Sequence, residues 1–164
     1  MRFRARQGTA GTDFQDPKQA AAVLSQARVL ASADGAGLKL MSGKRLALLS
    51  PEKGDEGATA FVQAATDLGA HVSFVQPSLD EASSASQVAD TARMLGQLYD
   101  AVECQHLPIS LVKRIASNAG IPVFAGLATA SHPTCALATE LQGDAPVEVK
   151  RRRILQAALL VSMG

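Results

Sequence analysis

The chain has 164 residues, of which 47% are apolar, a length that suits one compact domain and is short for two. Its formal net charge of +1 gives no reason to expect a nucleic acid or an anionic membrane as a partner. No apolar run approaches the roughly 18 residues of a membrane span, and the arginine-bearing start lacks a signal-peptide core, so we expect a cytoplasmic protein.

The start of the chain combines a polar arm with the signature of a helix. Residues 1–13 carry Arg and Gly, and we expect a flexible arm there, followed by a single domain over residues 14–164. Asp16 and Pro17 form a typical helix start, an N-cap followed by proline at the first helical position. The sequence therefore predicts a helix from Pro17 to about Ser32, where glycines follow.

From Lys44 onward, short apolar strands alternate with helices. Strands are predicted at residues 44–50, 72–75, 101–104 and 123–125. Helices are predicted at residues 57–68, 87–98, 109–118 and 133–141. This alternation is typical of repeated β-α-β units. The expected fold class is α/β, a four-stranded parallel sheet with helices on both faces.

The chain is predicted to close with a further helix. A short break at residues 142–146 precedes it, and apolar side chains then recur at helical spacing, among them Ile154, Leu155 and Leu159. Such a stripe needs an apolar surface to cover it. We therefore expect residues 146–164 to return to the domain and pack against it as its C-terminal helix.

The loop between the first strand and the next helix has conflicting features. A strand, a glycine-bearing loop and a helix N-terminus form an arrangement that elsewhere binds phosphate. This loop carries three carboxylates, on Glu52, Asp55 and Glu56, which would repel such a ligand. We expect Asp55 to be the N-cap of the helix, so that its carboxylate accepts the backbone N–H groups of residues 57 and 58.

Two cysteines and two histidines lie where strands are predicted to end. Cys104 with His106, and His132 with Cys135, would meet at the carboxyl edge of a parallel sheet, where ligands usually bind. A zinc ion with two sulfur and two nitrogen ligands is one reading. The other reading, which we prefer, makes the cysteines free packing residues, and it implies no metal and no cofactor.

A basic run occupies residues 150–153 at the start of the last predicted helix. Four consecutive positions point around the whole helix, so most of the run is expected to be a solvated face. Arg151 shares the stripe of Leu155 and Ala158, which directs it toward a subunit interface or a buried carboxylate. Few aromatic residues accompany the run, so it gives no support for a nucleic-acid partner.

Five segments in register resemble one enzyme family. They are Leu-Gly-Ala-His-Val at 68–72, Asp-Thr-Ala-Arg-Met-Leu at 90–95, residues 99–102, residues 121–127, and His132 with Pro133. Over about residues 44–141 the chain resembles the carbamoyl-phosphate-binding first domain of the aspartate and ornithine carbamoyltransferases. Residues 151–164 resemble the terminal helix of the same enzymes. The resemblance implies that their second, amino-acid-binding domain is missing between Leu141 and Val147.

The resemblance also implies which residues surround a ligand. The phosphate loop of the family, Ser-Thr-Arg-Thr-Arg, aligns with the residues that follow Lys53, namely Gly54, Asp55, Glu56, Gly57 and Ala58. Both arginines of that loop are absent here. The other aligned positions are Gln105 for an arginine, Cys135 for a glutamine, and Ser84 for a basic residue that a neighbouring subunit contributes. His132 and Pro133 alone keep the residues of the family, so His132 is the one candidate catalytic relic.

Three functions from different classes remain open at this point. In the first, which we prefer, the chain is an inactive carbamoyltransferase homologue that acts as an oligomeric binding or regulatory protein. Its expected partners are two further copies, in a homotrimer, or a full-length carbamoyltransferase. In the second it is a transferase-related enzyme with an altered ligand, using Lys53, Gln105 and His132. In the third it is a metal-binding or scaffold protein.

Overall fold

The computed structural model describes residues 16–32, 39–52, 54–129 and 132–163. In chain order its elements are α2 (Pro17–Ser32), β1 (Arg45–Leu49), α3 (Glu56–Asp67), β2 (His71–Val75), α4 (Ala85–Leu98), β3 (Ala101–Cys104), α5 (Ile109–Ala119), β4 (Val123–Ala125), the 3₁₀ helix η1 (Pro133–Glu140) and α6 (Val147–Met163). All predicted strands and helices lie at their expected places. The predicted flexible arm at residues 1–13 lies outside the described residues.

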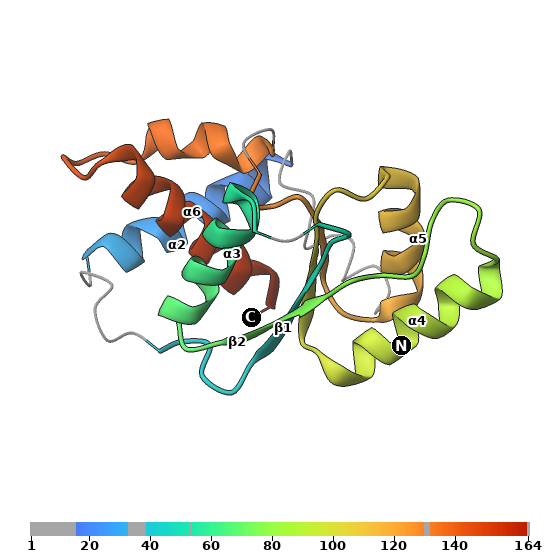
Figure 1. Ribbon diagram of the computed structural model, residues 1–164. Coiled ribbons are helices and arrows are strands. Elements are labelled where there is room, and N and C mark those ends of the chain that lie inside the picture. Colours follow the sequence, from blue (N-terminus) through green and yellow to red (C-terminus); the bar gives the residue numbers. More distant parts are fainter. Residues whose placement is uncertain (1–15, 33–38, 53, 130–131, 164) are drawn as a thin grey trace.

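The four strands form one parallel sheet in the order β2-β1-β3-β4. Helices α2, α3 and α6 cover one face, and α4 and α5 cover the other (Figure 1). The predicted α/β class and the parallel sheet with helices on both faces are thus confirmed. Because the strands are parallel, their carboxyl ends meet at one edge of the sheet and their amino ends at the other.

The helix predicted at residues 133–141 takes a tighter form than expected. The N–H of Cys135 donates to the carbonyl of His132, and the N–H of Leu141 donates to that of Ala138. These hydrogen bonds span three residues, as in a 3₁₀ helix. The hydroxyl of Thr139 also donates to the carbonyl of Ala136, at 2.8 Å, and this side-chain bond competes with α-helical pairing.

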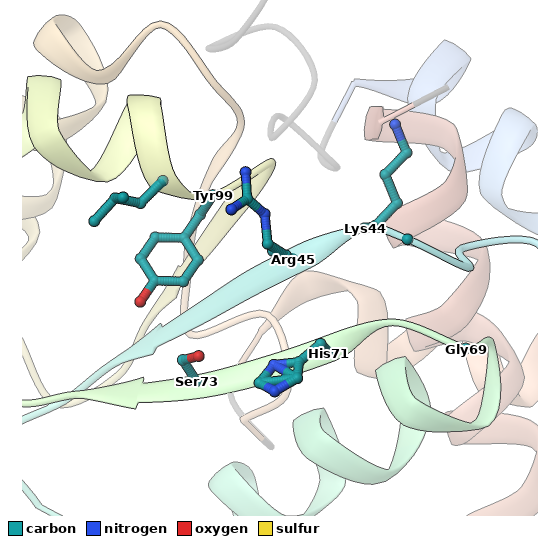
Figure 2. Close-up of a pocket in the computed structure, with 8 residues that line it drawn as sticks. Lys44, Arg45, Gly69, His71, Ser73 and Tyr99 are labelled. Atoms are coloured by element: carbon teal, nitrogen blue, oxygen red, sulfur yellow. The ribbon is translucent and has the colours of Figure 1, made fainter.

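Strand β2 lies at the edge of the sheet and is covered more fully on one face than on the other. Its residues pair with β1 in parallel register, with Arg45 opposite His71 and Ala47 opposite Ser73. Helix α3 packs on the face that carries Val72 and Phe74. On the other face, near the amino ends of β1 and β2, a hollow remains beside the end of α4 (Figure 2).

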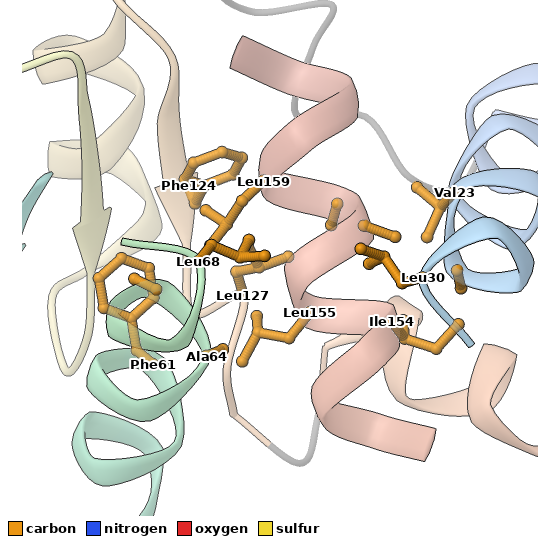
Figure 3. Close-up of a cluster of buried hydrophobic side chains, with 14 of the residues drawn as sticks. Val23, Leu30, Phe61, Ala64, Leu68, Phe124, Leu127, Ile154, Leu155 and Leu159 are labelled. Carbon is orange, nitrogen blue, oxygen red and sulfur yellow. The ribbon is translucent and has the colours of Figure 1, made fainter. Parts of the chain in front are cut away.

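The larger core lies between the sheet and the layer of α2, α3 and α6 (Figure 3). Side chains of α6 pack on both neighbouring helices, and Ile154 and Leu159 are 2% and 0% exposed. The buried residues drawn around them include Val23, Leu30, Phe61, Ala64, Leu68, Phe124 and Leu127. The expected return of the last helix to the domain is confirmed.

On the opposite face, α4 and α5 cross in close contact. A Cβ atom added at Gly96 would lie 2.0 Å from the carbonyl oxygen of Ala119, so only glycine permits this approach. Within the described ranges, no helix combines the length and the apolarity that crossing a bilayer requires.

Candidate functional site

A cavity of about 780 Å³ opens at the carboxyl edge of the sheet. It lies between the N-terminus of α3, the segment that follows β4, and the first turns of α6. Its volume falls within the roughly 300–1,000 Å³ that is typical of small-molecule sites. The lining residues that carry polar side chains are Asp55, Glu56, Thr59, Gln63, His106, Thr129, Thr134, Cys135, Glu148, Arg151 and Arg152.

Asp55 is the N-cap of α3. Its backbone is extended, with φ −89° and ψ 179°, and its Oδ1 accepts the N–H of Ala58 at 2.9 Å. The preceding Gly54 has φ +81°, a conformation in which glycine turns the chain without strain. The bond that the sequence predicted between the Asp55 carboxylate and the N–H of Ala58 is confirmed.

The second carboxylate oxygen of Asp55 meets the Nε2 atom of His106, which follows β3. The N–H of Ala58 and then His106 lower the pKa of Asp55, and the hydrogen bond to Asp55 raises the pKa of His106. His106 adopts φ +60°, an uncommon conformation for a residue with a side chain. The helix N-terminus therefore already carries an anion, and that anion has the His106 imidazole as its own hydrogen-bond partner.

Glu103 lies completely buried in β3 and holds the segment that follows β4. Its Oε1 accepts the N–H of Leu127 and its Oε2 accepts the N–H of Ala128, both at 3.0 Å. Gln105 donates from Nε2 to Oε2 of the same carboxylate, also at 3.0 Å. Burial raises the pKa of Glu103 to about 7, against the lowering effect of these three donors. The backbone behind the cavity is therefore fixed by one buried carboxyl group.

Gln105 lies directly beneath the start of α3. A Cβ atom added at Gly57 would stand 3.3 Å from Oε1 of Gln105, so the helix start rests closely on this amide. The Oε1 atom is buried and has no hydrogen-bond partner among the described residues. Gln105 is 1% exposed and does not line the cavity.

His132 is the N-cap of η1. Its Nδ1 accepts the N–H of Thr134 at 3.1 Å and lies 2.9 Å from the hydroxyl of the same residue. Burial lowers the pKa of His132 to about 4, so the ring is neutral at pH 7. His132 and the exposed Pro133 are not among the residues that line the cavity, whereas Cys135 is.

The remaining predicted site residues divide into three groups. Gly54, Glu56 and Gly57 line the cavity together with Asp55, and Ala58 is buried beside them at 7% exposure. Ser84 caps α4 in a reciprocal pair with Gln87 and does not line the cavity. Lys53 lies outside the described residues.

The zinc reading of the cysteines and histidines is wrong for this arrangement. Across the residues that the structure describes, no three His, Cys, Asp or Glu side chains are grouped so that they could hold a metal ion. Cys104 is buried in β3 at 2% exposure, and burial raises the pKa of its thiol. His106 is paired with Asp55 instead. The thiol of Cys135 donates to the carbonyl of Thr129 at 3.2 Å.

Helix α6 contributes side chains that the sequence did not place in the site. Arg151 was expected at an interface or a buried carboxylate; it lines the cavity and its Nη2 donates to the Sγ of Cys135 at 3.2 Å. Arg152 lies 4.0 Å from the carboxylate of Asp67. Glu148, in the first turn of α6, adds a third acidic group to the lining. The signal available was the helical stripe that Arg151 shares with the buried Leu155.

Residues 10–142 match the family described as aspartate/ornithine carbamoyltransferase, carbamoyl-P binding domain. The chain belongs to this family. Ornithine carbamoyltransferase from Actinobacillus pleuropneumoniae is 40% identical over 101 residues, which are 62% of this chain and 30% of that protein. The catabolic ornithine carbamoyltransferase of Mycoplasma capricolum subsp. capripneumoniae is 38% identical over 128 residues, 77% of this chain and 41% of that one. The chain therefore spans less than half the length of these relatives.

Solved structures of carbamoyltransferases share the fold. Ornithine carbamoyltransferase from Pyrococcus furiosus superposes with a TM-score of 0.64 at 26% identity, over 79% of this chain and 44% of that one. The enzyme from Thermus thermophilus gives a TM-score of 0.61 at 26% identity, over 78% and 45% of the two chains. The likeness is confined to less than half of each carbamoyltransferase chain.

Proposed function

We propose that this chain is a non-catalytic carbamoyltransferase homologue that acts in the cytoplasm as an oligomeric binding or regulatory protein. The observation that carries the proposal is the Asp55 carboxylate, whose Oδ1 accepts the N–H of Ala58 at 2.9 Å. In a phosphate-binding loop this donor would face the ligand. A phosphate at this place would have to displace the carboxylate and would then meet Glu56 as well.

Magnitudes support the loss of carbamoyl-phosphate binding. Each missing arginine of the aligned loop removes charge-assisted hydrogen bonds worth about 1.5–3 kcal/mol. A carboxylate about 5 Å from a phosphate charge adds repulsion of about 3 kcal/mol at an effective dielectric constant near 20. A micromolar ligand binds with only about 8 kcal/mol in total, so these losses together remove most or all of the affinity.

The groups aligned with the carbamoyl site also have other roles. The imidazole of His132 caps η1 and is neutral, and the amide of Gln105 is buried against Glu103. Residues 141–146 alone join η1 to α6, with no domain between them. Without anchors for a phosphate and without an amino-acid-binding domain, nothing orients two substrates for transfer.

The binding test is calorimetric titration with carbamoyl phosphate, run beside a full-length ornithine carbamoyltransferase. We expect no heat of binding at millimolar concentrations, and no synthesis of citrulline or carbamoyl-aspartate. The variant Asp55→Asn combined with Glu56→Arg keeps a cap acceptor, removes two negative charges and adds a cation, so it should gain affinity for phosphate. Glu140→Gln is the matched control, because Glu140 is exposed and does not line the cavity. Micromolar binding by the unmodified chain would overturn the proposal.

The oligomeric part of the proposal rests on the family resemblance. We propose that the chain forms a homotrimer, or joins a full-length carbamoyltransferase, with Ser84 near the site of a neighbouring subunit. Light scattering should then give the mass of three 17.0 kDa chains, or a mixed assembly when the enzyme is added. A chain that stays monomeric and ignores the enzyme would refute this part, while leaving the binding result unaffected.

A second candidate is a transferase-related enzyme with a less anionic ligand, and the retained cavity favours it. Its lining contains three carboxylates and two arginines, and it has an apolar wall that includes Leu127, Ile154 and Leu155. This candidate predicts that a small metabolite raises the melting temperature and that Arg151→Gln abolishes the increase. A set of amino acids and amines that leaves the melting temperature unchanged would count against it.

A further inference from the structure

A second hollow, of about 430 Å³, lies at the amino edge of the sheet, opposite the cavity described above. We call it the amino-edge pocket. It is bounded by the amino ends of β1 and β2 and by the end of α4 (Figure 2). Its lining residues are Gly43, Lys44, Arg45, Gly69, His71, Ser73, Leu98 and Tyr99.

The sheet register brings the polar members of this pocket together. Arg45 and His71 are directly opposite each other on neighbouring strands, and Ser73 follows on the same face of β2. Tyr99 adjoins Arg45, because the N–H of the next residue, Asp100, donates to the carbonyl of Arg45 at 2.7 Å. In Figure 2 the guanidinium of Arg45 lies beside the ring of Tyr99, with Ser73 below it and Lys44 on the far rim.

The two cations of this pocket form no ion pair within the described part of the chain. Neither Lys44 nor Arg45 forms an ion pair there, whereas Arg93 and Arg152 are each paired with an aspartate. The adjoining acid, Asp100, uses its Oδ2 to accept the backbone N–H of Arg45 at 2.8 Å. Two cations therefore line one hollow without an ion-pair partner among the residues that the structure describes.

We propose that the amino-edge pocket binds a small phosphorylated ligand with a planar ring, of the size of a nucleoside monophosphate. The guanidinium fork of Arg45 matches two phosphate oxygens, and Lys44 adds a second positive charge. The ring of Tyr99 and the half-exposed Leu98 offer a flat apolar wall for a base. The volume lies in the lower part of the range of small-molecule sites.

The chain provides its own reporter for this proposal. Tyr99 is the single tyrosine, and there is no tryptophan, so intrinsic fluorescence comes from a side chain that lines the pocket. Titration with AMP should change this fluorescence saturably, after correction for absorbance by the base, and calorimetry should give the same dissociation constant. Adenosine and inorganic phosphate, tested separately, should each bind about tenfold more weakly or worse, because each lacks one half of the recognised chemistry.

Arg45→Gln should weaken AMP binding about tenfold or more, and Lys44→Gln should do so by a smaller factor. Lys113→Gln is the matched control: it removes one exposed positive charge from α5, away from the pocket, and should leave AMP binding unchanged. Circular dichroism checks that each variant is folded. No saturable response to AMP, or equal affinity in Arg45→Gln and Lys113→Gln, would overturn the proposal. Equal affinity for phosphate and AMP would do the same, since the planar ring would then contribute nothing.

Discussion

The two edges of the sheet differ in whether their charged side chains have partners within the described protein. At the carboxyl edge, the donor at the start of α3 is taken by the Asp55 carboxylate, which in turn is paired with His106. At the amino edge, Lys44 and Arg45 have no ion-pair partner in the described part of the chain. The carboxyl edge thus supplies its own anion, whereas the amino edge pairs neither of these cations within the described ranges.

Packing explains part of this difference. The carboxyl edge is backed by α3 and α6, and the buried Glu103 ties the segment after β4 to the sheet. The amino edge borders the open face of β2, where helices cover less of the sheet. A buried group such as Glu103 must be satisfied by the protein itself, whereas water or a ligand can satisfy exposed groups at the amino edge.

Removal of Glu103 should produce the largest effect. Glu103→Ala leaves the buried N–H of Leu127 and that of Ala128 without an acceptor, at about 1–3 kcal/mol each. We expect the free energy of unfolding in urea to fall by about 2–4 kcal/mol at pH 7. Glu103→Gln is the control and should lose less, because its carbonyl still accepts one bond. A loss below about 0.5 kcal/mol in the alanine variant would show that the carboxyl edge is not held as described.

The same residue should make stability depend on pH. Its pKa is about 7 in the folded protein and 4.5 in the reference state, so the unfolded chain loses this proton first as pH rises. The contribution of Glu103 to stability is therefore fully present below about pH 4.5 and is lost as pH rises through about 7. The shift corresponds to a change on the order of 3 kcal/mol.

Comparison with Glu103→Gln isolates this effect from that of His132. The pKa of His132 is lowered to about 4 from 6.5, so its contribution is present above pH 6.5 and is lost as pH falls toward 4, the opposite direction. Urea midpoints at pH 5 and pH 7.5 should show the unmodified protein losing stability relative to Glu103→Gln as pH rises. A constant difference between the two proteins would contradict the assignment to Glu103.

A smaller effect is expected at the cap. Asp55→Ala removes the acceptor of the Ala58 N–H and should cost about 1 kcal/mol, and Asp55→Asn should cost less, because asparagine also caps helices.

The link to His106 gives this prediction a pH signature. The contribution of Asp55 is lost as pH falls through its lowered pKa, below 3.8, and that of His106 is lost as pH rises through its raised pKa, above 6.5. The difference in melting temperature between the unmodified protein and Asp55→Ala should therefore be larger at pH 5.5 than at pH 9. An equal difference in melting temperature at pH 5.5 and pH 9 would show that His106 does not contribute to the stability of the cap.

The features that the sequence predicted correctly are those set by residues close together in the chain. The strands and helices follow from local periodicity, and the Asp55 cap follows from one acidic residue at a helix start. The role of Glu103 was not predicted, although an acid in the otherwise apolar strand Ala-Val-Glu-Cys was a visible signal. Its partners lie 24 and 25 residues further along the chain, so only the folded sheet reveals them.

The side chains that line the two cavities were the least predictable features. The contact of Arg151 with Cys135 depends on how α6 crosses η1, and the amino-edge pocket depends on the register that places Arg45 opposite His71. The zinc reading failed for a related reason: residues at the same edge of a sheet need not point at one another. The 3₁₀ form of η1 also arises from bonds within the folded segment rather than from its apolar spacing.

The smallest effect on stability should occur at the amino edge, and its size would sharpen the comparison most. Arg45→Gln and Lys44→Gln remove exposed cations that have no ion pair in the described chain, so each should change the free energy of unfolding by less than about 0.5 kcal/mol. The backbone bonds of Arg45 to Asp100 do not require the guanidinium and should persist. Urea unfolding of both variants at low and high salt is the measurement. If either variant loses more than about 1 kcal/mol, its cation supports the fold, and the amino edge, like the carboxyl edge, satisfies its own charges. If both are neutral, the fold does not depend on these two cations, and the contrast with the buried Glu103 of the carboxyl edge stands.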